Sequence, residues 1–290
     1  MEVLLAILAA LQSLSPVGGQ PDIDHVPPIS APASIRSVKR GVILAVADSQ
    51  PNSPKARLIK SKAQKEAKKR ALPLLPRPTT LIVNVDGVER SALVYPGLKA
   101  HAAPSPVLLY FHGFTGTSKD SADRTKFHEL WPQATVVYPQ GLKTKRGSRN
   151  DNYGWQDERH GLWHDDNKDI RFVDRLLQEL SARCRIDPRC IYASGHSNGG
   201  LFCFLLLLQR PESFAAFAPV GCFGACVREA TTPRPVLFIF GEKDEVFDIR
   251  LAKDTLGRLL SLNRCSAERR KEWLDGCQMF VPDRGGEPVI

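Results

Sequence analysis

A serine stands between two glycines in the segment Gly195-His196-Ser197-Asn198-Gly199. A short apolar run precedes this segment and a longer one follows it, which predicts a strand, a tight turn and a buried helix. A turn that lifts a serine hydroxyl clear of a sheet leaves no room for side chains at Gly195 and Gly199. The spacing therefore predicts a nucleophilic serine, Ser197, at a strand-to-helix elbow. A glycine-rich turn with an incidental serine is the alternative.

A serine hydroxyl is a weak nucleophile at neutral pH, so it needs a histidine base and an acid that orients this base. We expect Asp244 to be the acid, because it follows the apolar run 235–240 in a Gly-x-x-Asp turn. An ordinary turn aspartate has the same appearance, and Asp248 is the reserve candidate.

The tetrahedral oxyanion of such a reaction needs two backbone N–H donors. For a serine elbow these come from the residue after the serine and from the loop after an earlier strand. The candidates are Asn198 and, in the loop His112-Gly113-Phe114 after the apolar run 106–111, Phe114. We expect His112 to shape this loop rather than to exchange protons.

The histidine base has no candidate at the expected place. The chain order for this architecture is serine, acid, histidine, but no histidine follows Asp244. The seven histidines lie upstream of the elbow or inside it: His25, His101, His112, His128, His160, His164 and His196. His196 is excluded because the side chain of a residue adjacent to the serine points elsewhere. We expect the base to lie beyond Ile290, so that the printed chain is a truncated one.

Strands and helices alternate along the part of the chain that must position these residues. The apolar runs predict strands at 81–85, 90–95, 106–111, 134–138, 190–194, 215–221 and 235–240, and helices at 127–131, 169–184, after the elbow and at 251–262. Several of the runs are continuously apolar, which is typical of strands covered on both faces. The order predicts an α/β fold with a doubly wound, mostly parallel sheet. Functional groups gather at the carboxyl ends of such strands.

The N-terminal part differs from this pattern. The first fifteen residues are apolar but too short to span a bilayer, and they resemble a secretory signal without its usual basic residue. We therefore expect a signal peptide at 1–20, an extension at 21–78 and a catalytic domain at 79–290. The expected location is secreted or periplasmic.

The extension holds the positive charge of the chain. Between Arg36 and Pro78 twelve lysines and arginines face only Asp48 and Glu66, which accounts for all of the net charge of +9. A tether to an anionic surface and a solvated linker are both compatible with this composition. No aromatic residues interleave with the charges, so we expect no nucleic-acid partner.

The seven cysteines show no metal-ligand spacing with histidines. Cys190 and Cys203 lie in apolar runs, where a free cysteine packs as a small hydrophobic residue. Cys265 and Cys277 flank a polar loop and are the better disulfide candidates if the protein is exported.

The elbow and its surroundings resemble the polyhydroxybutyrate depolymerase and feruloyl esterase group of α/β-hydrolases. The resemblance rests on Gly-His-Ser-Asn-Gly-Gly with its lead-in Asp187 to Tyr192, on the His-Gly loop, and on Arg90 with Val94-Tyr95-Pro96. Asp165-Asp166, Gly241-x-x-Asp244 and the Cys265 and Cys277 segments fit too, so that the resemblance covers about Thr79 to Ile290. In that group the final strand leads into a Gly-His segment that supplies the base.

The resemblance implies a serine esterase that forms an acyl-Ser197 intermediate and needs no metal or cofactor. Its substrate would be a short polyester, or a phenolic or acetyl ester on polysaccharide. Trp155, Trp163 and Asp165 are candidates for the substrate side, with core packing as an equal alternative for each tryptophan. A peptidase on this fold usually carries a large extra domain, for which the chain has no room. A non-catalytic α/β-hydrolase-like binding protein is the alternative.

Overall fold

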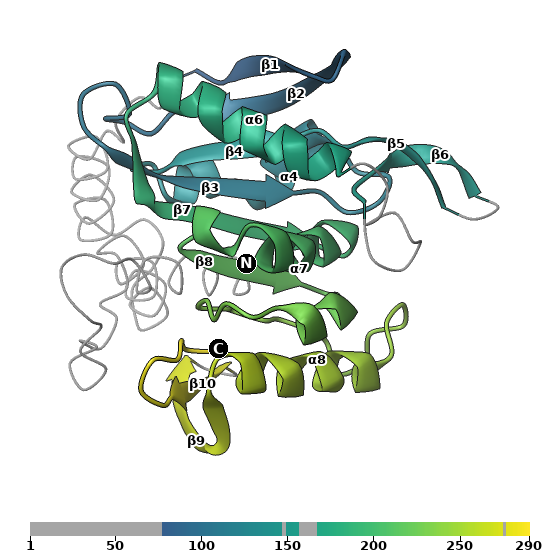
Figure 1. Cartoon of the computed structure of the whole chain (residues 1–290). Coiled ribbons are helices and arrows are strands. Elements are labelled where there is room, and N and C mark those ends of the chain that lie inside the picture. The colour runs from purple at the N-terminus through teal and green to yellow at the C-terminus, as the bar shows by residue number, and fades with distance from the viewer. Residues whose placement is uncertain (1–76, 147–148, 157–166, 275–276) are drawn as a thin grey trace, which may run out of the picture. The chain divides into compact units, whose positions relative to one another are not determined.

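A six-stranded sheet organises the part of the chain that the computed structural model describes, namely residues 77–146, 149–156, 167–274 and 277–290 (Figure 1). The strand order is β1 (Thr79–Val85), β2 (Val88–Tyr95), β4 (Thr135–Pro139), β3 (Ser105–Phe111), β7 (Ile186–His196) and β8 (Ala216–Val220). The pairs β1/β2 and β2/β4 are antiparallel, and the remaining pairs are parallel. The predicted α/β fold with a mostly parallel sheet is confirmed.

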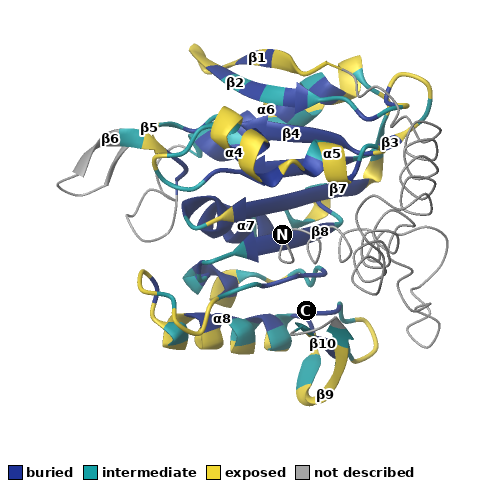
Figure 2. Cartoon of the chain, turned by 180° about the vertical axis from the view of Figure 1, so that it is seen from behind, coloured by how far each residue is buried: buried dark blue, intermediate teal, exposed yellow. Residues whose placement is uncertain are grey.

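Helices cover both faces of this sheet, as Figures 1 and 2 show. One face carries α6 (Lys168–Arg183) and α7 (Asn198–Gln209), and the other carries α4 (Ser118–Thr125) and α5 (Phe127–Leu130). Helix α7 is apolar all round and is buried from Asn198 to Leu207, whereas α8 (Ile249–Leu262) keeps an exposed side (Figure 2). A helix that is apolar on every side has to lie inside the protein, and α7 packs on β7 and β8 directly after the elbow.

Three elements differ from the sequence-based expectation. Helix α4 was not predicted, because its segment is polar and buries only Ser121, Ala122 and Thr125. The expected polar loop after β4 contains a hairpin of β5 (Leu142–Arg146) and β6 (Arg149–Gly154). Residues 235–240 lie beside β8, with Val236 opposite Phe217 and Ile239 opposite Val220, but as isolated bridges rather than as a regular strand.

The polar segment near the C-terminus also forms a hairpin, of β9 (Cys265–Leu274) and β10 (Cys277–Pro282). Its register pairs Cys265 with Pro282 and Cys277 with Leu274. Cys265 therefore faces a position five residues along the strand from Cys277, a separation of about 17 Å at the usual rise per residue. A disulfide needs Cα atoms within about 7 Å, so these two disulfide candidates are too far apart to bond to each other, and both are free thiols.

The predictions for residues 1–20 and 21–78, and those for Trp163 and Asp165, lie outside the described residues. Within the described ranges, no helix combines the length and the apolar character needed to cross a membrane.

Candidate active site

Ser197 lies at the apex of the turn between β7 and α7. Its backbone has φ 54° and ψ −115°, which is uncommon for a residue with a side chain and is typical of a strained functional turn. A Cβ atom on Gly199 would stand 2.1 Å from the carbonyl oxygen of Phe111, and one on Gly195 would stand 2.6 Å from the backbone of Gly199. The prediction that both positions exclude side chains is confirmed, because the elbow packs directly on the end of β3.

The predicted strand ends meet at one edge of the sheet. Phe111 at the end of β3 pairs with Gly195 on β7, and a Cβ on Gly113 would stand 3.6 Å from the Cβ of Ser197. The loop that contains Phe114 therefore begins beside the serine. His196 at the end of β7 pairs with Val220 of β8, and Val220 forms a bridge with Ile239, so the Asp244 turn that follows begins at the same edge. Burial lowers the pKa of His196, and the negative charge of Asp244 opposes this shift.

The two candidate acids differ in their hydrogen bonds. Asp244 is half-buried, and its Oδ1 accepts the backbone N–H groups of Val246 and Phe247 at 2.8 and 2.9 Å. Asp248 caps the start of α8 and forms an ion pair with Arg250, whose hydrogen bonds lower the pKa of Asp248 to about 2. Asp248 is thus engaged with its own helix, so we keep Asp244 as the proposed acid.

The ring of His112 is buried and bridges two loops. Its Nε2 accepts the N–H of Gly141 at 3.0 Å, which assigns the ring proton to Nδ1, where it donates to the carbonyl oxygen of Gly113 at 2.7 Å. Burial lowers the pKa of this histidine, although the hydrogen bond to Gly113 acts in the opposite direction. A neutral ring with a hydrogen bond at each nitrogen fits the expectation that His112 shapes the loop rather than exchanges protons.

This burial predicts that the protein becomes less stable in mild acid. A histidine whose pKa is lowered in the folded state binds its proton more tightly when unfolded, so stability is lost as the pH falls below the ordinary value of 6.5. We expect a loss of up to about 1.4 kcal/mol for each pH unit below that value. Urea unfolding at pH 7.5 and 5.5 measures it, and His112→Gln should reduce the difference. An equal difference in both proteins would contradict the assignment.

Trp155 packs in the core and does not line the substrate side, which decides between the two alternatives that the sequence left open. Its side chain is fully buried, stacks on Phe202 with ring centroids 5.3 Å apart, and meets Phe111 edge-on at 5.1 Å. An indole packed against apolar rings contributes most to the stability of the fold when it is removed from water. The tryptophan therefore belongs to the core beneath the elbow.

A buried polar network, which the sequence analysis did not predict, holds Gln156, the residue that follows Trp155. Arg90 on β2 forms an ion pair with Asp169 on α6 at 2.7 Å, and both side chains are almost fully buried. Asp169 also accepts the backbone N–H of Gln156 at 2.8 Å, and Gln156 returns a bond by accepting the Asp169 N–H at 2.9 Å. Arg90 and Asp169 are 79 residues apart in the sequence, so no local pattern indicates their contact.

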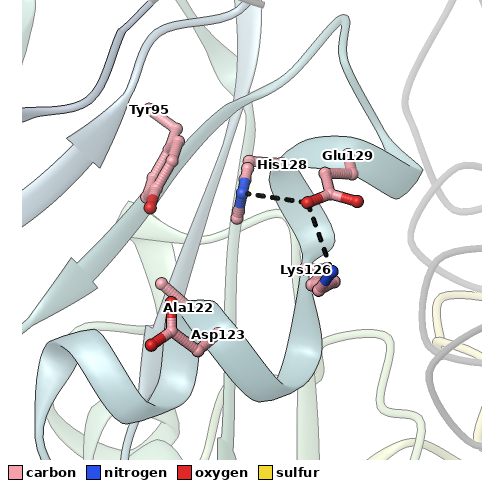
Figure 3. Close-up of a pocket in the computed structure, with 6 residues that line it drawn as sticks. All are labelled: Tyr95, Ala122, Asp123, Lys126, His128 and Glu129. Atoms are coloured by element: carbon pink, nitrogen blue, oxygen red, sulfur yellow. Dashed lines mark ion pairs between the residues drawn. The ribbon is translucent and has the colours of Figure 1, made fainter.

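A polar surface pocket lies apart from this edge. It is lined by Tyr95, Ala122, Asp123, Lys126, His128 and Glu129, from β2 and the α4–α5 segment (Figure 3). The Tyr95 ring stacks on His128 at 3.6 Å, and Lys126 pairs with Glu129 at 3.6 Å. The charges in the pocket are thus partly compensated from within, and none of its residues belongs to the elbow. We therefore place the candidate active site at the sheet edge.

Esterases are among the known proteins that the chain resembles. The chain is 30% identical over 156 residues to "Putative esterase NocK" of Nocardia uniformis subsp. tsuyamanensis, covering 51% of this chain and 43% of that protein. It is 27% identical over 188 residues to the bifunctional acetylxylan esterase/xylanase XynS20E of Neocallimastix patriciarum, covering 63% and 25%. It is 23% identical over 211 residues to feruloyl esterase B of Piromyces equi, covering 64% and 38%. The chain thus spans less than half the length of these relatives.

One solved structure, the crystal structure of native sOPH, has the same fold, with a TM-score of 0.50 at 16% identity over 66% of this chain and 78% of that one. Residues 87–249, which include the elbow, the loop after β3 and the Asp244 turn, match the family model described as "Putative esterase". This match extends over more than half of the sequence, and the chain therefore belongs to the esterase family.

Proposed function

We propose that this domain hydrolyses carboxylic esters through an acyl intermediate on Ser197. The observation that carries the proposal is the strained backbone of Ser197 at the elbow, with the loop after β3 directly beside it. Such a turn presents a serine hydroxyl at the edge of the sheet where an ester can reach it. Membership of the esterase family supports the reaction class.

In the proposed reaction a base removes the Ser197 hydroxyl proton as the oxygen attacks the ester carbonyl. The backbone N–H groups of Asn198 and Phe114 stabilise the oxyanion, the alcohol leaves with the proton, and water then releases the acid. Asp244 orients the base and stabilises its cation. Three of the described histidines are not placed to act as this base. His101 precedes β3 at the far edge, His112 is held by two loops, and His128 lines the separate pocket.

The printed sequence has no histidine after Asp244, so the proposal assigns slow turnover to the 290-residue chain. Small diffusible bases should then accelerate it. The alternative is the non-catalytic α/β-hydrolase-like binding protein.

The proposed substrates are acetyl or feruloyl esters on polysaccharide, with a short polyester as the alternative. The two fungal relatives are named for acetylxylan and feruloyl esters, and the resemblance at the elbow points to the same group. Polymeric substrates of this kind fit the proposed secreted or periplasmic location. Acetate released from acetylated xylan, ferulate from feruloylated xylan and 3-hydroxybutyrate from the polyester distinguish the three.

Hydrolysis of 4-nitrophenyl acetate, with and without imidazole, tests the mechanism. We expect imidazole to accelerate hydrolysis by the unmodified chain beyond the background reaction of imidazole with the ester. Ser197→Ala should abolish this additional rate, because it removes the hydroxyl that the added base would activate. Ser194→Ala is the matched control, since Ser194 is a buried serine of β7 whose hydroxyl donates to Ala218. Equal rates for the unmodified chain and Ser197→Ala would favour the binding domain.

A further inference from the structure

Two hydrogen-bonded links connect the start of α7 with the loop after β3. The side-chain amide of Asn198 accepts the backbone N–H of Trp155 at 2.7 Å and donates to its carbonyl oxygen at 3.1 Å. The indole Nε1 of Trp155 in turn donates to the carbonyl oxygen of His112 at 3.0 Å. Trp155 is 43 residues from each of these partners in the sequence, so it joins two elements that are distant along the chain.

These two elements carry the proposed oxyanion donors. Asn198 supplies one donor from its own backbone, and Phe114 supplies the other, two residues after the carbonyl that Trp155 holds. Oxyanion donors act only within about 2.7–3.1 Å of the developing charge, and a displacement of about 1 Å can lower a rate about a hundredfold. The separation between α7 and the loop therefore determines whether both donors reach one oxygen atom.

We propose that Asn198 and Trp155 are positioning residues, which hold the two oxyanion donors at a fixed separation. This role belongs to the Asn198 amide and the Trp155 indole, and it is separate from the role of the Asn198 backbone. It rests on the proposed function of Ser197, because an oxyanion forms only if the serine attacks an ester.

The surroundings make this link rigid. Asn198 and Trp155 are fully buried and His112 is 2% exposed, so water cannot readily replace a lost hydrogen bond. The indole ring is fixed between Phe202 and Phe111. Removal of one partner would leave buried polar groups unsatisfied, which the structure could relieve only by moving the loop or the helix start.

A second asparagine provides a matched control. Asn263 is also fully buried, and its amide donates to the carbonyl oxygen of Arg234 at 2.6 Å and accepts the Arg234 N–H at 3.3 Å. Arg234 precedes the run 235–240, so this pair lies at the opposite edge of the sheet from Asp244. Asn263→Ala removes the same kind of amide–backbone pair without touching the oxyanion loop.

The experiment measures kcat and KM for 4-nitrophenyl acetate in Asn198→Ala, Trp155→Phe and Asn263→Ala, with imidazole present. Rates are divided by the amount of Ser197 that a fluorophosphonate labels at completion, so that misfolded protein does not count. The dissociation constant of phenylboronic acid, which mimics the tetrahedral intermediate, is measured in parallel. Trp155→Phe keeps an aromatic ring against Phe202 and removes the indole N–H together with the five-membered ring that carries it.

We expect kcat to fall about a hundredfold in Asn198→Ala and about tenfold in Trp155→Phe, with KM within about twofold and a parallel loss of boronate affinity. Asn263→Ala should keep kcat within about twofold. Unchanged kcat in Trp155→Phe would overturn the proposal, and so would a loss of kcat in Asn263→Ala equal to that in the other two variants. If Asn198→Ala does not fold, the result for Trp155→Phe decides. Absence of Ser197-dependent turnover in the unmodified chain would instead overturn the proposed function, and this inference with it.

Discussion

Replacement of Gly199 by alanine is expected to destabilise the protein by about 3 kcal/mol or more and to abolish ester hydrolysis. The added methyl group would stand 2.1 Å from the carbonyl oxygen of Phe111 and 2.7 Å from that of His112. Both contacts are with backbone, so no side-chain rotation relieves them. Relief requires that α7 and the end of β3 move apart, which also separates the proposed oxyanion donors.

Gly257→Ala is the control for this substitution. Gly257 lies in α8, and a Cβ there would meet nothing within 4 Å. Alanine is favoured over glycine inside a helix by about 1 kcal/mol, so this variant should be slightly more stable than the unmodified chain. Urea unfolding of both variants measures the difference. Equal midpoints for Gly199→Ala and the unmodified chain would show that the elbow is not packed as described.

Replacement of Asp169 by asparagine is expected to cost about 3–5 kcal/mol, because it leaves the guanidinium of Arg90 buried without an opposite charge. Arg90 is 2% exposed and Asp169 is fully buried, so water cannot solvate the cation. Arg90 also lies over the ring of Phe172 at 4.1 Å, a contact too weak to replace the ion pair. The double variant Arg90→Met/Asp169→Asn should recover part of the loss, since it removes the unpaired charge.

Asp86→Asn removes the same kind of charge at the surface. Asp86 pairs with Arg171 at 2.6 Å, but the side chains are 63% and 39% exposed. Pairs of this kind contribute less than about 1 kcal/mol. Free energies of unfolding for the two asparagine variants test the contrast. A loss in Asp169→Asn no larger than that in Asp86→Asn would contradict the importance of the buried pair.

The parts of the fold that the sequence predicts are those with local signatures. Continuous apolar runs indicated β3, β4, β7 and β8, because strands covered on both faces exclude polar residues. The elbow was predictable because its steric requirement falls on glycines within two residues of Ser197. Both signals arise from neighbours in the sequence.

The buried polar network was not predictable from the sequence. Its hydrogen bonds join Asn198 to Trp155 and Arg90 to Asp169, across 43 and 79 residues, and a single asparagine or arginine looks the same at the surface as in the core. The place of Trp155 stayed open for the same reason, since it stands in a polar segment. The β9–β10 hairpin was missed because β9 is rich in charge and neither strand has a regular apolar alternation.

Covalent labelling of Ser197 tests the central claim most directly. A fluorophosphonate reacts when a serine oxygen attacks phosphorus and fluoride leaves, and the labelled residue is identified by mass spectrometry of the digested protein. With imidazole present, we expect the label on Ser197, slower labelling when phenylboronic acid is added, and no specific label in Ser197→Ala. Label on another serine, or none on a folded chain, would contradict the assignment of Ser197 as the nucleophile.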